Sequence, residues 1–411
     1  MEAEDAPRKY DVIVFGVTGF TGQFVAEELQ RLATSGGLKW AVAGRNKSKV
    51  QAVLNESGIE GIDVLVADVS DQDSLEAMCA DATVIIDCVG PYQLYGEPVV
   101  KACISQKCNY VDITGETFYM ETIESKYDQQ ARDAGVYIVC SCGFDSIPND
   151  MGALMVQKSF NGDLAYVDSY VTLHGSNLNF NTGTWESLVR GLNNHSNLMK
   201  LRKRVNLPPL ALPAYQPPPR KSLFYSEFVK RWCGPFQGSD RAVVYRSMRY
   251  RQENEGVSSF KFRPYISFTS FWQAIGTVIL FIPVIILTMT NWGIKLLIKY
   301  PKFFSAGLAQ TPKREDLDGL SFSVTLEGYG YSPGAEKTAA PDSRVTVKVS
   351  GGDPGYGATS VILVQSALCI VNEKESLPAS GGVYTPAAVF GNTNLIQNLN
   401  DTGKVKFELV E

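Results

Sequence analysis

The sequence predicts an α/β fold with two parts, a doubly wound parallel sheet followed by a second α+β domain whose sheet is mainly antiparallel. Three observations support this prediction. A strand, a glycine-rich turn and a helix follow one another in residues 10–31. Strand-like and helix-like segments then alternate over about the first 150 residues. Apolar and polar residues alternate with period two in residues 168–173, 322–328 and 344–349.

The first strand–turn–helix unit has the features of a dinucleotide cradle. The apolar run 12–15 is typical of a buried parallel strand, and residues 23–31 have a helical pattern. Three glycines at three-residue spacing separate them. The first glycine permits a tight turn, the second lets the backbone approach the pyrophosphate, and the third lets the helix pack against the strand. Because strand and helix flank the glycines, we expect a Rossmann cofactor site rather than a ligand-free turn. Its expected binding residues are Gly16, Thr18, Gly19, Phe20, Thr21 and Gly22.

The second strand, expected at residues 40–44, ends where the adenosine ribose of a dinucleotide would lie. NAD-preferring cradles usually place Asp or Glu there to bind the ribose 2′-hydroxyl. This chain has Arg45 instead, followed by Lys47 and Lys49. A guanidinium binds phosphate oxygens bidentately and stacks on aromatic faces. Arg45 therefore favours NADP(H), with NAD(H) as the less favoured cofactor. The alternative is that Arg45 only caps or solvates the next helix.

The third and fourth strands are expected to end beside the same site. Residues 64–68 form the third strand, and Asp68 either contacts the adenine side or is the N-cap of the helix at 71–80. Residues 84–90 form the fourth. Its exit brings Cys88, Gly90 and Pro91 to the ligand-binding edge of the sheet, and we expect the next helix to open at residues 96–98.

Chain length and strand pattern set the expected domain boundaries. A chain of 411 residues exceeds one ordinary domain. Strands at 109–116 and 136–140 complete the parallel sheet, and the sixth leaves through residues 143–150. We expect a Rossmann domain in residues 1–150, a substrate domain in 151–263 and 318–411 with a helix at 358–372 covering its sheet, and an apolar insert at 264–305.

Composition argues against several classes of protein. A net charge of −5 and a pI near 5.4 give no nucleic-acid footprint. The eight cysteines show no CxxC pair or zinc-ligand spacing. Residues 1–9 are polar, so no secretory signal is expected, and reduced thiols in the cytosol fit best.

The insert is far more apolar than the rest of the chain. Residues 264–294 contain no charged side chain. This segment is long enough for a helix to span a bilayer. Three features argue against a simple span. Pro283 lies near its middle and would break or kink a helix. Lysine and arginine flank both ends, so no orientation is favoured. A single crossing would also separate residues 322–411 from the cofactor domain.

We therefore expect a re-entrant or interfacial hairpin on the cytosolic face of a lipid droplet or membrane, with a basic and aromatic second anchor at residues 292–304. The alternatives are a buried core helix and an interface between two copies in a homodimer.

Hydride transfer usually needs an acid beside the nicotinamide to protonate the product. Tyr92 follows the fourth strand and is one candidate, although such tyrosines often pack or bind ribose. Asp145, with Ser146, leaves the sixth strand and either orients substrate or forms a turn. His174 follows a predicted strand and is either catalytic or a structural hydrogen-bonding group. Glu116 is a further residue expected to face the cleft.

Five sequence blocks together resemble the saccharopine dehydrogenase-like oxidoreductases of animals. They are residues 14–25, 40–45, 88–92 with 96–98, 143–148 and 381–386, and the apolar insert also looks like theirs. The resemblance covers nearly the whole chain. It implies a Rossmann domain with an α/β substrate domain, association with lipid droplets or membranes, and distant kinship with true saccharopine dehydrogenases and bacterial trans-acting enoyl reductases.

Three functions follow as hypotheses. The first is an NADP(H)-dependent oxidoreductase at a lipid surface, acting on a carbonyl or enoyl group of a lipid-like small molecule. The second is a non-catalytic nucleotide-binding scaffold or sensor on lipid droplets. The third is a saccharopine-type amino-acid dehydrogenase, which needs arginines converging on the pocket. The sequence has arginines between residues 190 and 251 but does not place them in a cleft.

Overall fold

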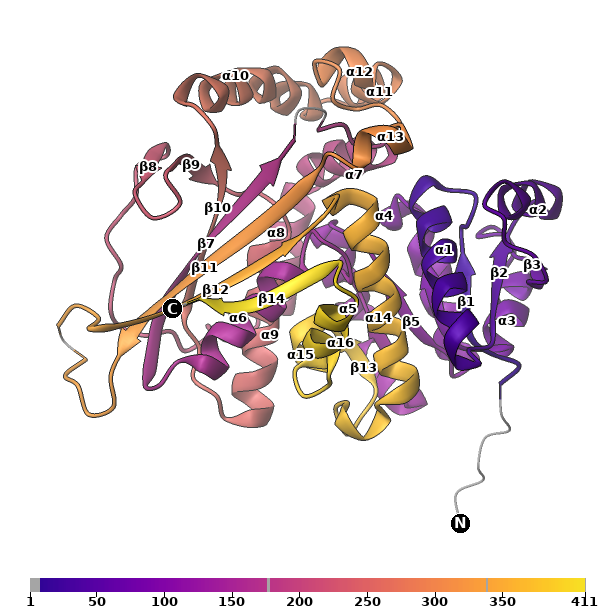
Figure 1. Ribbon diagram of the computed structural model, residues 1–411, viewed down its shortest axis with the longest axis horizontal. Coiled ribbons are helices and arrows are strands. Elements are labelled where there is room, and N and C mark those ends of the chain that lie inside the picture. The colour runs from indigo at the N-terminus through magenta and orange to yellow at the C-terminus, as the bar shows by residue number, and fades with distance from the viewer. Residues whose placement is uncertain (1–7, 176–177, 338, 411) are drawn as a thin grey trace.

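The computed structural model describes residues 8–175, 178–337 and 339–410, which form two seven-stranded sheets (Figure 1). The first sheet is parallel throughout, in the order β13-β6-β5-β4-β1-β2-β3. This confirms the Rossmann-like sheet. Its strands are β1 (Tyr10–Phe15), β2 (Trp40–Gly44), β3 (Val64–Val66), β4 (Ala82–Asp87), β5 (Asn109–Asp112), β6 (Tyr137–Val139) and β13 (Gly382–Tyr384).

Helices follow the strands of this sheet in alternation. They are α1 (Phe20–Gly36), α2 (Lys47–Glu56), α3 (Gln72–Ala80), α4 (Tyr92–Ser105) and α5 (Thr117–Ala134). The expected start of α4 at residues 96–98 is wrong, because the helix begins at Tyr92 and Pro98 lies inside it. The Glu116 carboxylate explains the earlier start, since it accepts the backbone N–H groups of Tyr92 and Gln93 at 3.0 and 3.1 Å.

The second sheet has the order β14-β12-β11-β7-β10-β9-β8, and only its β7–β10 pair is parallel among the described strands. A mainly antiparallel second sheet is thus confirmed. Its strands are β7 (Asp163–His174), β8 (Phe224–Ser226), β9 (Arg231–Pro235), β10 (Lys261–Phe268), β11 (Ser321–Tyr331), β12 (Ser343–Gly351) and β14 (Val405–Val410). Residues 264–268, expected to open the insert, belong to β10.

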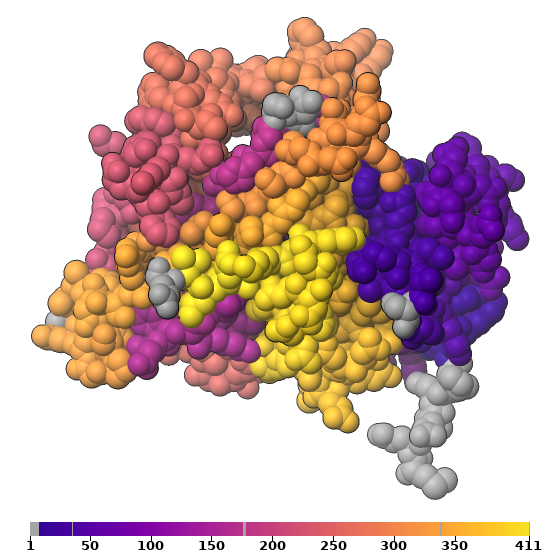
Figure 2. Space-filling model, in the orientation of Figure 1, coloured from indigo at the N-terminus to yellow at the C-terminus, as the bar shows by residue number. Residues whose placement is uncertain are grey.

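The C-terminal part of the chain returns to the first sheet. Helix α14 (Thr359–Asn372), expected to cover the second sheet, packs instead on α1, β4 and β5. Strand β13 pairs with β6 and adds the seventh strand. In Figure 2 this C-terminal segment, in yellow, lies between the N-terminal part and the second sheet. The two sheets therefore interleave along the chain, and the boundaries at residues 150, 263 and 318 stay a prediction.

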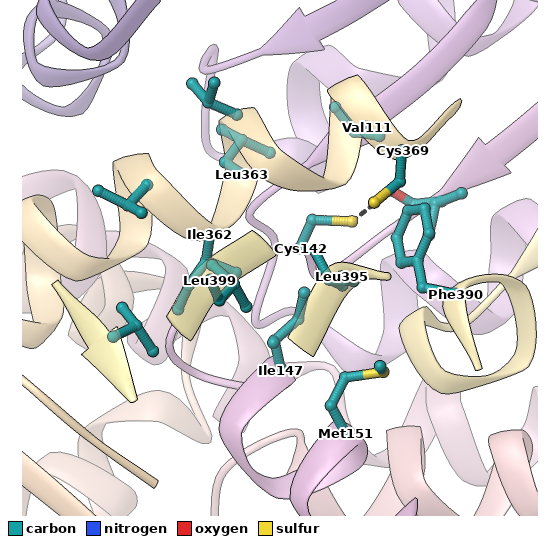
Figure 3. Close-up of a cluster of buried hydrophobic side chains, with 14 of the residues drawn as sticks. Val111, Cys142, Ile147, Met151, Ile362, Leu363, Cys369, Phe390, Leu395 and Leu399 are labelled. Carbon is teal, nitrogen blue, oxygen red and sulfur yellow. Dashed lines mark hydrogen bonds between the residues drawn. The ribbon is translucent and has the colours of Figure 1, made fainter. Parts of the chain in front are cut away.

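One apolar core connects the two sheets. Helix α6 (Ile147–Ser159) packs on β11 and β12, and its Ile147 and Met151 belong to the same apolar cluster as side chains of α14. Figure 3 shows these side chains with Cys142 and Cys369 and with residues of the short helices α15 (Pro386–Phe390) and α16 (Leu395–Asp401). Both cysteines are buried free thiols. This shared core fixes the position of one sheet relative to the other.

The remaining helices come from the middle part of the chain. They are α7 (Thr182–Asn193), α8 (His195–Val205), α9 (Asp240–Glu255), α10 (Phe271–Thr288), α11 (Asn291–Lys299), α12 (Pro301–Phe304) and α13 (Arg314–Leu317). Helices α10, α11 and α12 form the top edge of the molecule in Figure 1. The Trp185 indole of α7 donates a hydrogen bond to the Leu297 carbonyl of α11 at 3.0 Å and so joins these two helices.

Helix α10 is the apolar segment that the sequence singled out. It runs without interruption through Pro283, so of the break or kink expected at this proline, the break does not occur. Two described helices are long and apolar enough to cross a membrane, α10 and the segment Pro354–Asn372 that contains α14. The second is 72% buried and is a core helix, whereas only 17% of α10 is buried. The alternative of a buried core helix for the insert is therefore wrong.

Candidate active site

The glycine turn after β1 has the shape of a dinucleotide cradle. Gly16 has φ of +94°, a backbone conformation that favours glycine. The third glycine, Gly22, packs directly against the backbone of residues 16 and 17 in the turn. A Cβ at Gly22 would lie 2.8 Å from Val17 Cα and closer still to the Gly16 carbonyl oxygen. Gly19 is the N-cap of α1 and supplies no side-chain cap. The first N–H groups of α1 thus remain free for a phosphate, and the residues present fit a dinucleotide.

Arg45 is exposed at the end of β2 and makes no hydrogen bond within the described residues. Asn46, not Arg45, is the N-cap of α2, because its side chain accepts the Lys49 N–H at 2.9 Å. The alternative role of Arg45 as a helix cap is thus wrong, and its guanidinium is free to bind a 2′-phosphate.

Asp68 lies one turn before α3. The N-cap of that helix is Asp71, so the capping alternative for Asp68 is wrong. The Asp68 carboxylate instead accepts the backbone N–H and the hydroxyl of Ser70, and these bonds lower its pKa. The positive charge of Arg45 lowers it further, which indicates that both residues face the same end of the cradle.

A cleft of about 2,760 Å³ runs from the cradle between the two sheets. Of the expected cofactor residues, the structure brings Gly19, Phe20, Thr21, Cys88 and Gly90 to its wall. Thr18 is exposed on the turn, and Pro91 is buried behind the wall as the N-cap of α4, after a cis peptide bond with Gly90. Phe20 packs edge-on against Tyr356, a cleft residue that the sequence did not reveal.

Tyr92 borders the cleft, but its hydroxyl points back into the protein. It donates to the Asp87 carbonyl at 2.9 Å, and the side chain is 6% exposed. Burial holds the pKa of this phenol well above its usual value. These contacts favour a packing role over proton donation.

Glu116 links helices α4 and α7 through hydrogen bonds to its buried carboxylate. Besides capping α4, its carboxylate accepts the hydroxyl of Ser187 on α7 at 2.7 Å. Burial raises the pKa of Glu116, and its three donors oppose that rise. The expectation that Glu116 faces the cleft is not met, since Gly115, Thr117 and Ser187 line the cleft around it.

Asp145 lies at the cleft wall beside a second carboxyl group. The Ser239 hydroxyl donates to Asp145 Oδ2 at 3.0 Å, and Asn149 Nδ2 donates to Asp240 Oδ1 at 2.7 Å. The other oxygen of Asp240 is buried without a partner in the described residues. Burial raises the pKa of Asp145 to about 6. Burial, and then the charge of Asp145, raise the pKa of Asp240 well above its ordinary value. The pair therefore retains a proton near neutral pH.

The structure separates His174 from this group. Its Nε2 lies 3.2 Å from the Ser323 hydroxyl, and the side chain borders a different, smaller cavity with Lys348. Burial, and then the charges of Arg231 and Lys348, lower its pKa. These contacts favour the structural hydrogen-bonding role given above as the alternative.

Four arginines line the cleft, which the sequence did not establish. Arg202 pairs with Glu121 at 2.6 Å, Arg246 with Glu124 at 3.0 Å, and Arg249 with Glu253 at 3.4 Å. The fourth, Arg241, stacks over the Tyr245 ring. Three of these guanidinium groups therefore already have carboxylate partners within the chain.

Comparison with known proteins agrees with this geometry. Residues 12–139 match the saccharopine dehydrogenase NADP-binding domain. The human saccharopine dehydrogenase-like oxidoreductase is 38% identical over 98% of each chain. The protein belongs to this family. The chain is therefore an oxidoreductase with an NADP-binding domain.

Two further relatives extend across nearly the whole chain. A Caenorhabditis elegans protein named lipid droplet localized protein is 35% identical, covering 96% of this chain and 97% of its own. A putative trans-acting enoyl reductase of Mycobacterium tuberculosis is 30% identical over 97% of each. Among solved structures, a yeast saccharopine dehydrogenase (L-Glu forming) has a TM-score of 0.57 at 14% identity, covering 98% of this chain and 100% of its own. That similarity shows the fold alone.

Proposed function

We propose that this protein is an NADP(H)-dependent oxidoreductase that works on the cytosolic face of a lipid droplet or membrane. Its substrate is a lipid-soluble molecule with a carbonyl or enoyl group. One observation carries the proposal: a chain with an NADP-binding cradle also presents a large, exposed apolar helical surface. A water-soluble amino acid as substrate gives no reason for such a surface.

The surface of α10, α11 and α12 has the chemistry of a lipid anchor. Trp272, Met289 and Phe303 are each more than three-quarters exposed. Three lysines lie in the same segment, at positions 295, 299 and 302. Tryptophan favours the membrane interface, and lysine is attracted to anionic headgroups. Burying one large apolar side chain contributes about 1.5–3 kcal/mol, so a few of them suffice for docking.

When bound, NADPH supplies a hydride to an electrophilic carbon of the substrate and becomes NADP⁺. A carbonyl oxygen then needs one proton to become an alcohol. For an enoyl group the hydride goes to the β-carbon and the proton to the α-carbon. We assign the proton to the carboxyl group of Asp145, which lies at the cleft wall and shares a buried environment with Asp240.

The names of two relatives support the proposal. One is called lipid droplet localized protein, and the other putative trans-acting enoyl reductase. Three of the four cleft arginines have carboxylate partners, whereas Arg241 has none among the described residues, so the turnover assay below has to separate this proposal from the saccharopine-type alternative.

The test is a turnover assay on vesicles. Purified full-length protein is mixed with NADPH and phosphatidylcholine–phosphatidylserine vesicles that hold long-chain aldehydes, ketones or enoyl esters, and the loss of NADPH absorbance is followed. We expect turnover of at least one of these substrates and none with saccharopine in solution. Turnover of saccharopine would support the amino-acid dehydrogenase instead, and NADPH binding without any turnover would support the scaffold.

Docking is measured separately by sedimentation with the same vesicles. Trp272→Asp removes an exposed anchor and adds a charge, so we expect vesicle binding to weaken at least about tenfold. Tyr225→Asp, at a residue exposed on β8 outside the helical surface, is the control. Equal binding of both variants would contradict docking through α10.

A further inference from the structure

We propose that α10 is also one wall of a passage that delivers a long-chain lipid from the lipid layer into the active-site cleft. The substrate would then be a membrane-resident molecule with a long acyl or alkyl chain, held along this helix while its reactive group reaches the cofactor. The inference rests on the proposed function and names the substrate class and its entry route.

The cleft that begins at the cofactor cradle reaches α10. Side chains of Ile275, Val278, Phe281 and Ile285 border the same cavity as Gly19, Cys88 and Asp145. Four leucines of α7 and α8 border it as well, at positions 188, 192, 198 and 201. From Phe271 to Met289 the chain contains no charged side chain. The passage therefore has an apolar wall from α10 and apolar side chains on α7 and α8.

Helix geometry divides α10 into three faces. At about 100° per residue, the cleft residues 274, 275, 277, 278, 281, 285 and 288 fall on one broad stripe, and Met289 just after the helix borders the cleft as well. Val284 and Leu287 form a second face, which packs with Trp185 and Leu297 of α7 and α11. Trp272, Ile279 and Ile286 form a third face, and all three are exposed.

This division explains why α10 is apolar all around. An interfacial helix that only lies on a lipid surface needs one apolar face and carries polar residues on the other. Here the outward face is free to meet lipid, the second face meets protein, and the third faces the cleft. An apolar face on a solvent-filled polar cleft would be unfavourable, whereas on a lipid-filled cleft it is complementary.

The dimensions are sufficient for a long chain. The cavity of about 2,760 Å³ exceeds the roughly 300–1,000 Å³ of an ordinary small-molecule pocket. It thus has room for both a dinucleotide and an extended lipid. The 18 residues of α10 span about 27 Å, and one leaflet of a hydrocarbon core is about 15 Å thick. A chain from one leaflet is therefore shorter than the wall beside it.

Charged groups occupy another part of the same cleft. The Arg202–Glu121 and Arg246–Glu124 pairs join α5 to α8 and α9. The cleft therefore has an apolar wall at the lipid-facing helix and a polar region elsewhere. This arrangement suits a molecule with a long apolar chain and one polar reactive end.

The test maps where a lipid chain lies in the full-length protein. Palmitic acid with a photoreactive diazirine in its chain is placed in phosphatidylcholine–phosphatidylserine vesicles, the NADPH-loaded protein is added, and cross-linked residues are located by mass spectrometry. We expect cross-links on Val278 or Phe281 and on Leu198 or Leu201 across the cleft. Cross-links confined to Trp272, Ile279 and Ile286 would overturn the proposal.

Two neighbouring residues provide a matched pair of variants. Val278 and Ile279 are both more than half exposed, but only Val278 borders the cleft. Val278→Trp fills the passage and should reduce cross-linking to Leu198 and Leu201 about tenfold, whereas Ile279→Trp should not. Unchanged labelling in Val278→Trp would contradict the passage.

NADPH affinity and vesicle sedimentation of both variants are measured alongside. We expect neither property to weaken, because tryptophan keeps both positions apolar. If the wild-type protein binds no NADPH or does not sediment with vesicles, that result refutes the proposed function rather than the passage. In that case, the same diazirine probe in detergent micelles tests the passage without vesicle docking. Cross-links on Leu198 or Leu201 would support the passage, and cross-links confined to the outward face would overturn it.

Discussion

Replacing Asp145 by Asn isolates the carboxyl group to which proton transfer is assigned. The substitution keeps the shape of the side chain and an oxygen that accepts the Ser239 hydroxyl, now 3.0 Å from Asp145 Oδ2. It removes the ability to ionise. Because burial raises the pKa of Asp145 to about 6, an ionised carboxylate at this position destabilises the folded state.

The magnitude follows from linkage. A rise from 3.8 to about 6 corresponds to about 3 kcal/mol, an upper bound because the side chain is only partly buried. Below about pH 4 the carboxyl is protonated in both states and the penalty is absent, whereas above about pH 6 it is fully present. Asp145→Asn should therefore raise the free energy of unfolding at about pH 8, by up to that amount, and leave it unchanged near pH 4. Denaturant unfolding at both values measures this difference.

Activity should change in the opposite direction. Loss of a general acid typically lowers the rate about 10²- to 10⁴-fold. In the wild-type protein, kcat/KM for reduction should fall as pH rises through about 6, because only the protonated carboxyl donates. This decline should disappear in Asp145→Asn. Ser239→Ala removes a donor that favours the ionised form, so the decline should move to higher pH. A stable Asp145→Asn protein with full activity and an unchanged pH profile would refute this assignment.

Two further substitutions test the cradle and the wall behind it. Gly22→Ala places a Cβ against backbone atoms of Val17 and Gly16, so NADPH affinity should fall about ten- to a hundredfold in a fluorescence titration. The control is Gly36→Ala in the same helix. Its Cβ meets no atom within 4 Å, so this variant should bind NADPH with unchanged affinity. Glu116→Gln replaces one carboxylate oxygen by an amide N–H₂, which then faces at least one of the three donors, so thermal denaturation should show a loss of about 1–3 kcal/mol. Glu97→Gln, in an exposed ion pair with Lys126, should cost less than about 1 kcal/mol, and equal losses in both would contradict the capping role of Glu116.

The cofactor domain was predictable because its signals are local. Gly16, Gly19 and Gly22 specify a turn between a strand and a helix adjacent in sequence, and β2 has the bounds expected from residues 40–44. The start of α4 was misplaced because its cap comes from Glu116, far along the chain. A proline normally indicates a helix start, and only this distant contact shows that Pro98 lies inside.

The environment of the proposed proton donor depends on contacts that no local pattern encodes. Asp145 and Asp240 are far apart in the sequence, and only the docking of α9 on α6 brings them together. His174 was a candidate by residue type alone. The register of β7 against β11 places it opposite Ser321, and its Nε2 lies within hydrogen-bond distance of the Ser323 hydroxyl. Likewise, α14 has a uniformly apolar pattern that does not specify which of two sheets it covers.

The apolar insert shows what composition does and does not determine. Its hydrophobicity identified α10 as exceptional, and its exposure in the structure agrees with an unpartnered surface. The division of α10 into a cleft face, a protein face and an outward face was not predictable, because all three are equally apolar. Only the positions of α7, α8 and α11 assign neighbours to two of these faces and leave the third exposed.

Selective binding of NADPH tests the central claim most directly, since the proposed chemistry begins with that cofactor. Fluorescence titrations with NADPH and NADH compare the wild-type protein with Arg45→Ala and with Lys39→Ala, which removes an exposed charge at the opposite end of β2. We predict that NADPH binds more tightly than NADH, and that Arg45→Ala weakens NADPH alone by about ten- to a hundredfold, as expected for a lost charged hydrogen bond. Lys39→Ala should change neither. Failure of the wild-type protein to bind either cofactor, or equal affinities that Arg45→Ala leaves unchanged, would contradict the account.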